Sequence, residues 1–233
     1  MPDSLQINSP NGSFHAFVAR PSVMPAPAIV VIHEVFGVNA DMRQSCEELA
    51  AQGYLAVCPD LFWRIEPGLA MTDRTAAELA RAAELYAAFN LDTGVIDIAA
   101  TIDAVRRMPE CTGKVGVVGY CLGGLLSYLT TARIGADAAV AYYPGNADLH
   151  LDEAEGVESP LIVHLAQEDE YIGKPTQRQL HDALDHRAQV QVYSYPGCGH
   201  AFARHRGIAY DAAAAALANG RTADFLASHL KQS

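Results

Sequence analysis

A cysteine set between glycines is the feature of this sequence that most directly suggests chemistry. The stretch GYCLGG runs from Gly119 to Gly124 and follows the small and β-branched run KVGVV, so Cys121 lies in a G-x-C-x-G pattern. Many enzymes place a nucleophilic serine at the centre of this pattern, on a sharp turn between a strand and a helix. A thiol there predicts attack by sulfur on a carbonyl carbon. The alternative is a structural thiol in a strand-to-helix turn, because free cysteine is among the most buried residue types.

A nucleophile needs a base, and the base needs a group that orients it. His200, in PGCGHAF, follows the apolar run VQVYSY, and Asp169, in LIVHLAQEDEYI, follows the run LIVHL. Nucleophile, acid and histidine occur in this chain order in the α/β-hydrolase fold. Because each candidate follows a predicted strand, we expect all three at the carboxyl edge of one sheet. Glu168 and Glu170 flank Asp169 and are alternatives for the acid.

Glu34 is a second carboxylate placed at the end of an apolar run. It follows AIVVIH, in HEVFG. A carboxylate at a strand end is ordinarily solvated, but this strand is predicted to be central and to end at the proposed site. In this fold an oxyanion is bound by one backbone N–H from the loop after that strand and one from the residue after the nucleophile. The corresponding residues are Val35 and Leu122, and each donor contributes about 3 kcal/mol.

The apolar pattern predicts the elements that would hold these residues. Short apolar runs alternate with helical stretches, which indicates an α/β protein with the α/β-hydrolase fold, a mostly parallel central sheet and helices on both faces. We expect one domain over residues 1–233. The chain is predicted to begin with a hairpin that turns at Asn11–Gly12, and further strands are predicted in AIVVIH, YLAVCPD, KVGVVGY, AAVAYYPG, PLIVHLAQ and VQVYSYPG. The first predicted helix runs from an Asp41 cap to Gly53, and two more lie between Thr72 and Met108 with a break near 90–94. The remaining helices are predicted over 122–133, over 175–187 and from about Tyr210.

Net charge, apolar content and cysteine usage indicate which partners and which cellular compartment to expect. The formal charge of −11 argues against nucleic acid, which requires a basic face. No apolar stretch reaches the roughly 18 residues of a membrane-spanning helix, and the N-terminus lacks a signal-peptide pattern. Five scattered cysteines without a C-x-x-C pair indicate a reduced, cytoplasmic protein. We expect a monomer or small homo-oligomer.

Metal binding is not expected from the histidine and cysteine spacings. Cys198 lies two residues before His200 and offers half of a metal site, but the glycines around the two residues suit a mobile catalytic loop equally well. The remaining histidines are expected to be structural, including His33, His164 and His205.

Over almost its whole length the sequence resembles the dienelactone hydrolase (carboxymethylenebutenolidase) family. The resemblance lies in HEVFGVN, GYLAVCPDLF, KVGVVGYCLGG, AYYPG, QEDEYI and GHAFAR. It implies a triad of Cys121, His200 and Asp169, no metal or cofactor, and a lactone or ester substrate from the degradation of aromatic compounds. It also implies a role for Glu34: in the family this glutamate holds the resting thiol neutral through a hydrogen bond and moves when substrate binds, so that the thiol ionises.

The family pattern is incomplete where the substrate carboxylate is held by two arginines and a serine. Arg204 matches one arginine, whereas Ala201 takes the serine position and Leu79 the position of the second arginine. Arg81 or Arg74 is the alternative second cation. We therefore expect a shifted or relaxed preference for an anionic lactone. The resemblance also suggests substrate contacts for Phe36 and Tyr143.

The predicted function is hydrolysis of a small-molecule lactone or ester. A carboxylesterase or thioesterase of the same fold is an alternative within this class. A non-catalytic, thiol-sensing protein that uses Cys121 is the alternative from another class, and rapid hydrolysis of an activated ester, lost on Cys121→Ala, separates the two.

Overall fold

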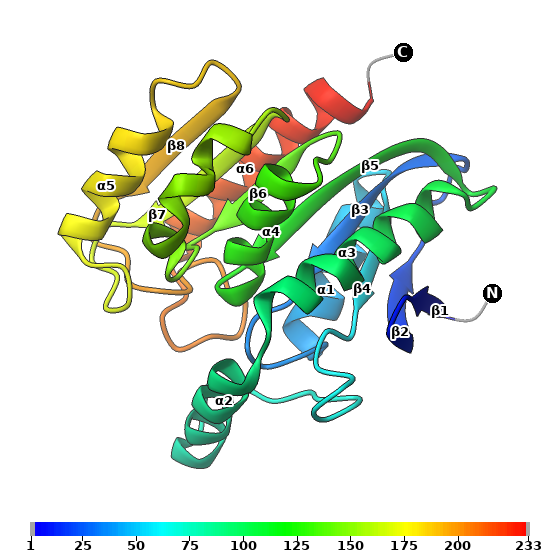
Figure 1. Ribbon diagram of the computed structural model, residues 1–233, viewed down its shortest axis with the longest axis horizontal. Helices are drawn as coiled ribbons and strands as arrows, with labels where there is room; N and C mark the ends of the chain where they lie inside the picture. The colour runs from blue at the N-terminus through cyan, green and yellow to red at the C-terminus, as the bar shows by residue number, and fades with distance from the viewer. Residues whose placement is uncertain (1–2, 232–233) are drawn as a thin grey trace. The chain divides into compact units, whose positions relative to one another are not determined.

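The computed structural model describes residues 3–231, and the chain divides into two compact units, residues 1–117 and 118–233. The boundary falls within the strand β5 (Cys111–Tyr120). Each unit is described by itself, with the labels of Figure 1.

The first unit begins with an antiparallel hairpin. Strands β1 (Ser4–Ser9) and β2 (Gly12–Ala19) pair so that Ser9 faces Gly12, and the connecting residues are therefore Pro10 and Asn11, one position earlier than predicted. Strand β2 pairs antiparallel with β4 (Leu55–Pro59), and β4 pairs parallel with β3 (Ala26–Ile32). Nearly every residue of β3 and β4 is buried, which explains their continuous apolar sequences.

Within residues 3–117 these strands are accompanied by three helices, α1 (Ala40–Ala51), α2 (Ala76–Ala88) and α3 (Leu91–Arg106). Helices α1 and α3 lie on opposite faces of its strands (Figure 1). The predicted Asp41 cap is wrong, because the Asn39 side chain accepts the Met42 N–H and leaves Asp41 in the first turn. The break between α2 and α3 comes at Asn90, which caps α3, so Gly94 lies inside that helix.

The second unit alternates helices with parallel strands. Strands β6 (Ala139–Tyr142), β7 (Leu161–Ala166) and β8 (Val190–Tyr195) pair in parallel. Helices α4 (Leu122–Arg133) and α5 (Lys174–Leu184) lie on one face and α6 (Ala212–Leu230) on the other (Figure 1). A 3₁₀ segment, η1 (Ala147–Gly156), was not predicted, since its polar sequence has no helical apolar stripe. Helix α6 continues through Asn219–Gly220, because buried residues on both sides hold it in place.

The strands follow the order β1-β2-β4-β3-β5-β6-β7-β8. This mixed α/β arrangement, with a mostly parallel sheet and flanking helices, confirms the predicted fold class. The single domain over residues 1–233 stays a prediction.

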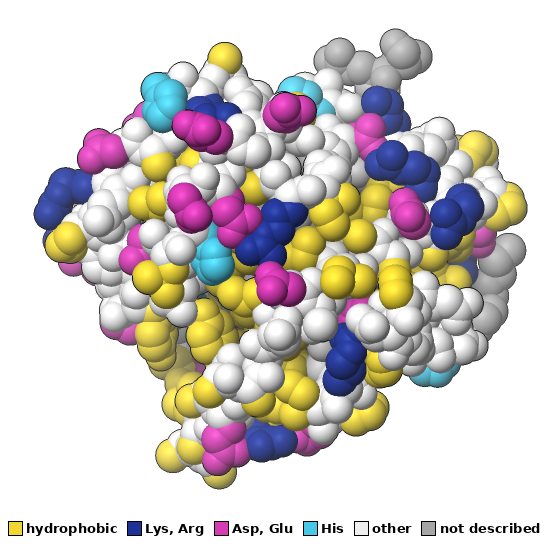
Figure 2. Space-filling model, in the orientation of Figure 1, with side chains coloured by type: hydrophobic (Ala, Val, Ile, Leu, Met, Phe, Trp, Pro, Cys, Tyr) yellow, Lys and Arg dark blue, Asp and Glu magenta, His cyan; other side chains and the backbone are white. Residues whose placement is uncertain are grey.

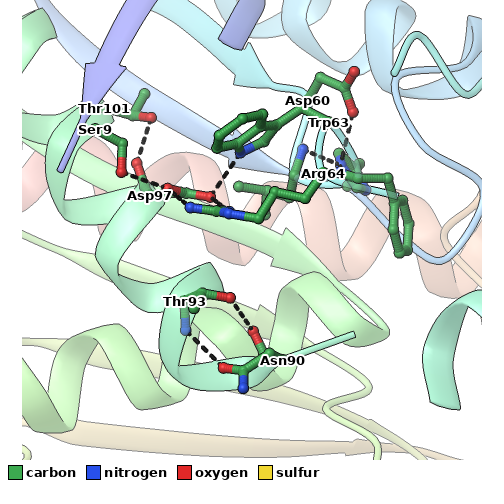
Figure 3. A network of polar contacts seen from close by, with 11 residues as sticks. Ser9, Asp60, Trp63, Arg64, Asn90, Thr93, Asp97 and Thr101 are labelled. Atoms are coloured by element: carbon green, nitrogen blue, oxygen red, sulfur yellow. Dashed lines mark hydrogen bonds and ion pairs between the residues drawn. The ribbon is translucent and has the colours of Figure 1, made fainter. Parts of the chain in front are cut away.

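A buried carboxylate joins several elements of the first unit (Figure 3). Asp97 of α3 is fully buried. Its Oδ1 accepts hydrogen bonds from Ser9 Oγ at 2.7 Å and Arg64 Nη2 at 3.0 Å, and its Oδ2 accepts from Trp63 Nε1 at 2.9 Å and from Arg64 Nη1. Because a buried charge is tolerated only when it is paired and hydrogen-bonded, this network fixes the hairpin and the loop after β4 to α3. The sequence patterns did not indicate it.

The distribution of charged side chains and the apolar character of the helices bear on what the protein can contact. On the face shown in Figure 2, Lys and Arg side chains are scattered among acidic ones. Among residues 3–231 no single helix has the length and apolar character to cross a membrane, although α2 and α3, which meet at 89°, pass that test as a bent pair.

Candidate active site

Cys121 stands on a tight turn between β5 and α4. Its backbone has φ 55° and ψ −113°, a conformation that costs energy for any residue other than glycine. The neighbouring backbones are in near contact: a Cβ atom on Gly119 would come within 1.9 Å of the Gly123 carbonyl oxygen, and one on Gly124 within 2.3 Å of the Tyr142 carbonyl oxygen. The glycines of the motif are therefore required by backbone packing.

Cys121 immediately precedes the first turn of α4. The Cys121 N–H donates to the Tyr142 carbonyl at 3.0 Å, which fixes the turn against the end of β6. Leu122 begins α4, and no side chain caps that helix start. The first-turn N–H groups and the helix dipole therefore favour negative charge at this end of α4, as a thiolate or an oxyanion requires.

His200 and Asp169 follow neighbouring parallel strands. Ala166, which ends β7, pairs with Tyr195, which ends β8, so the loops after these strands emerge side by side. Nδ1 of His200 lies 2.8 Å from Oδ2 of Asp169, and both residues are 6% exposed. These two predicted residues are brought together in the second unit, the unit that also carries Cys121.

The structure distinguishes among the three acidic neighbours in this loop. Oδ1 of Asp169 accepts the N–H groups of Tyr171 at 2.8 Å and Ile172 at 3.0 Å, which fixes the carboxylate while Oδ2 faces the ring. Glu168 instead pairs with Lys174 at 3.0 Å. Glu170 reaches His200 through the backbone, since its Oε2 accepts the His200 N–H at 3.2 Å. Asp169 is thus the residue among the three that contacts the imidazole.

Aromatic rings enclose the imidazole. The rings of Tyr143 and Tyr171 lie edge-on to it, with centroids 5.0 Å and 4.9 Å away. Tyr143, a predicted substrate contact, is fully buried and has φ 36°, and its N–H donates to the His164 carbonyl at 2.7 Å. Tyr171 is 70% exposed and was missed in the sequence; its position two residues after Asp169 was the available signal.

The electrostatics of His200 link it to Cys121. Burial lowers the pKa of His200, but interaction with Cys121 and with Asp169 outweighs burial and raises that pKa to about 10. Nε2 is buried and makes no well-formed hydrogen bond to any residue in the described range. The charge of Cys121 is the largest cause that raises this pKa, and a smaller hydrogen-bond contribution from the same residue adds to it. This environment favours the protonated form of His200.

The first unit carries the predicted residues of HEVFG, just beyond β3. Glu34 and Phe36 are 1% and 4% exposed, and Val35 is half-buried. His33 Nε2 accepts the Leu61 N–H at 3.0 Å, so Nδ1 carries the proton and donates to the Glu34 carbonyl at 2.7 Å. Burial also lowers the pKa of His33. His33 is therefore a neutral structural residue that fixes the backbone just before Val35.

The candidate anion-binding residues differ in their surroundings. Arg204 is 7% exposed, and its stem packs on Gly207, where a Cβ atom would come within 2.9 Å of it. Arg81 is bound by Glu66 at 2.7 Å and by Glu84 at 2.8 Å, so its charge is already balanced. Leu79 is 45% exposed. A second cation from α2 thus finds no support in these contacts.

Metal-binding geometry is not found in the described part of the chain, where no group of three or more His, Cys, Asp or Glu side chains converges. Cys198 is 5% exposed, and burial raises the pKa of its thiol. A thiol kept protonated is a poor metal ligand.

Comparison with known proteins gives consistent matches. A family model described as "Dienelactone hydrolase family" matches residues 14–230. The carboxymethylenebutenolidase of Pseudomonas putida is 40% identical over 226 residues, covering 97% of this chain and 96% of that protein. A putative carboxymethylenebutenolidase of Azospirillum brasilense is 41% identical over 221 residues, covering 94% and 95%.

Solved structures show the same fold. A putative dienelactone hydrolase from Klebsiella pneumoniae superposes with a TM-score of 0.85 at 24% identity, covering 96% of this chain and 97% of that one. The dienelactone hydrolase-like promiscuous phosphotriesterase P91, from metagenomic libraries, gives a TM-score of 0.81 at 21% identity, covering 97% and 98%.

Proposed function

The chain belongs to the dienelactone hydrolase family, and from this premise we propose that it hydrolyses a lactone or ester through a triad of Cys121, His200 and Asp169. Its relatives place it among hydrolases that act on lactones or esters. The observation that carries the finer proposal is the environment of His200. One face of the imidazole is fixed by Asp169 at 2.8 Å, and the pKa is raised by Cys121, the residue of the tight turn.

Acylation follows from these contacts. The Cys121 thiolate attacks the carbonyl carbon, and the resulting oxyanion is stabilised by the N–H groups of Leu122 and Val35, the predicted donors. The C–O bond to the leaving oxygen then breaks, and protonated His200 gives its proton to that oxygen. In a lactone the ring opens and the alcohol or enol remains attached to the acyl group. The product on the enzyme is a thioester of Cys121.

Deacylation uses the same base in its neutral form. His200 takes a proton from water, the hydroxide adds to the thioester carbonyl, and the thiolate leaves. Asp169 keeps the Nδ1 proton in place, so that Nε2 faces the reacting groups in both steps. Because the thiolate is a good leaving group, we expect activated esters and enol lactones to be better substrates than amides.

The incomplete anion site bears on the substrate. Arg204 supports binding of a carboxylate, whereas Ala201 lacks the hydroxyl and Arg81 is bound to two glutamates. We propose that the enzyme accepts neutral lactones and esters alongside anionic ones.

Nucleophile removal tests the proposal. Cys121→Ala should lower kcat for an activated aryl ester by at least about 10³-fold, because nucleophile and base act as a unit. Cys111→Ala is the matched control, since Cys111 is another partly exposed thiol, at the opposite end of β5 from the turn. Near wild-type turnover by Cys121→Ala would exclude the thiol mechanism. A wild type that is alkylated at Cys121 but hydrolyses nothing in a panel of lactones and esters would favour thiol sensing instead.

A further inference from the structure

The segment that carries His200 adopts a strained backbone. Gly197 has φ 75° and Ala201, directly after His200, has φ 63°. Glycine adopts the left-handed region freely, but alanine does so only at a cost in free energy. A loop in this conformation keeps its shape only if contacts from outside the loop hold it.

Three consecutive residues of the loop after β7 provide such contacts. The Glu168 N–H donates to the Cys198 carbonyl at 2.8 Å. Asp169 binds the His200 ring. Glu170 Oε2 accepts the His200 N–H at 3.2 Å and lies 3.6 Å from where a Cβ atom on Gly199 would stand. His200 is therefore held at two points, the ring by Asp169 and the backbone by Glu170.

We propose that Glu170 is a positioning residue, which fixes the backbone of His200 so that the ring bound to Asp169 presents Nε2 to the reacting groups. The inference rests on the proposed function, since it assumes that His200 is the base. A side chain tethered only at Nδ1 can still pivot about that hydrogen bond. A second hydrogen bond at the main-chain nitrogen removes this freedom. We also expect that Ala201 cannot leave the left-handed region without breaking this second hydrogen bond.

The role assigned to Glu170 is geometric rather than electrostatic. The interactions that raise the pKa of His200 are those with Cys121 and Asp169. Glu170 is exposed, so solvent screens its charge, and its contact is with the peptide N–H rather than the imidazole. An uncharged acceptor of the same shape should therefore serve as well as the carboxylate.

The experiment compares Glu170→Ala, Glu170→Gln and Glu168→Ala in the full chain, with an activated aryl acetate as substrate. Glu168 is the matched control, because it is an exposed glutamate of the same loop whose side chain pairs with Lys174. We expect Glu170→Ala to lower kcat about 3- to 10-fold, the effect of one solvent-accessible hydrogen bond, with KM and the pH profile unchanged. Glu170→Gln and Glu168→Ala should stay within about 2-fold of wild type, because each keeps the acceptor for the His200 N–H.

Several results would overturn the inference. One is wild-type kcat in Glu170→Ala. Another is an equal loss in Glu170→Gln, or a shifted pH profile, which would indicate a charge effect. An equal loss in Glu168→Ala would indicate a general effect of loop charge. The proposed function is tested separately by Cys121→Ala and His200→Ala: if these are inactive while Glu170→Ala is unimpaired, the positioning role alone is wrong.

Discussion

Replacing Asp169 by asparagine tests the orientation of the base. The substitution keeps size and shape, and the backbone contacts determine which way the new amide points. Oδ1 accepts two N–H groups, from Tyr171 and Ile172, so the amide oxygen is held there and the NH₂ group faces His200 Nδ1. The flipped amide would direct NH₂ at two N–H donors, at a cost of about 1–3 kcal/mol for each hydrogen bond left unmade.

The retained orientation reverses the imidazole tautomer. Nδ1 must accept from the new NH₂ group, so the ring proton moves to Nε2, the atom that faces the reaction. Neutral His200 then cannot take a proton from water during deacylation. We expect kcat to fall about 10³- to 10⁴-fold, which at 1.36 kcal/mol per decade is about 4–5.5 kcal/mol of transition-state stabilisation. Loss of the Asp169 charge also lowers the pKa of His200, because that charge is among the causes that raise it.

The assay is steady-state and burst kinetics with an activated aryl ester, together with thermal unfolding to confirm folding. A burst of aryl alcohol followed by very slow turnover would show that deacylation carries the loss, since an activated leaving group needs little help from the acid. Glu168→Gln is the control for charge in the same loop. A folded Asp169→Asn enzyme that keeps more than about a tenth of wild-type kcat would refute the tautomer argument.

Three further predictions concern other residues. Glu34→Gln should change the pH dependence of iodoacetamide alkylation at Cys121, followed by mass spectrometry. The reason is that the family resemblance implies that this glutamate holds the resting thiol neutral. An unchanged pH profile would mean that Glu34 has no such role. The wild type should only modestly prefer a carboxylate-bearing lactone to its methyl ester, measured as kcat/KM. Arg204→Ala should abolish most of that preference, since one charged hydrogen bond contributes about 1.5–3 kcal/mol. A strong wild-type preference that collapses in Arg81→Ala would instead show that Arg81 has rebuilt the anion site. Burial lowers the pKa of His164 to about 3, below its ordinary 6.5, so its contribution to stability is complete above pH 6.5 and is lost as pH falls toward 3. At pH 5 this lowers the free energy of unfolding by about 2 kcal/mol. Urea unfolding should therefore show a smaller drop in the free energy of unfolding between pH 7 and pH 5 in His164→Gln than in the wild type. An equal drop in the two proteins would contradict the role assigned to His164.

The sequence predicted the strands and most helices because their apolar patterns are local. Runs such as AIVVIH and LIVHLA are buried on both faces, and burial on both faces leaves a continuous apolar signature. Helix starts were less certain, since capping depends on one side chain reaching one N–H. Asn39 and Asp41 both suit a cap, and only the backbone path selects Asn39. The Asp97 network escaped prediction because its partners lie up to 88 residues away.

The site residues divide in the same way. Cys121, Asp169 and His200 were predicted because each follows a strand and their order matches a known fold. The residues alone left Glu168 and Glu170 as alternatives to Asp169, and the family resemblance favoured Asp169, whose carboxylate contacts the imidazole in the structure. The sequence likewise gave no sign of the buried hydrogen bonds that connect the strands of the second unit to α6. His164 Nε2 meets Thr222 Oγ1 at 2.9 Å and Tyr142 OH meets the same oxygen at 2.7 Å, contacts that join β6 and β7 to α6.

The turn at Cys121 suits a thiol for a physical reason. Its backbone is fixed by the Tyr142 carbonyl and by glycines that admit no side chain, so the nucleophile cannot move far to meet its base. A thiol has an unperturbed pKa of about 8.5, close enough to that of histidine for its proton to transfer fully to the base. A serine hydroxyl, far less acidic, transfers its proton only during attack. Cys121 is the leading interaction that raises the pKa of His200, so the turn favours a protonated imidazole. The ring must give this proton to the leaving oxygen before it can activate water, which is why the second step depends on Asp169 and on a precisely held ring.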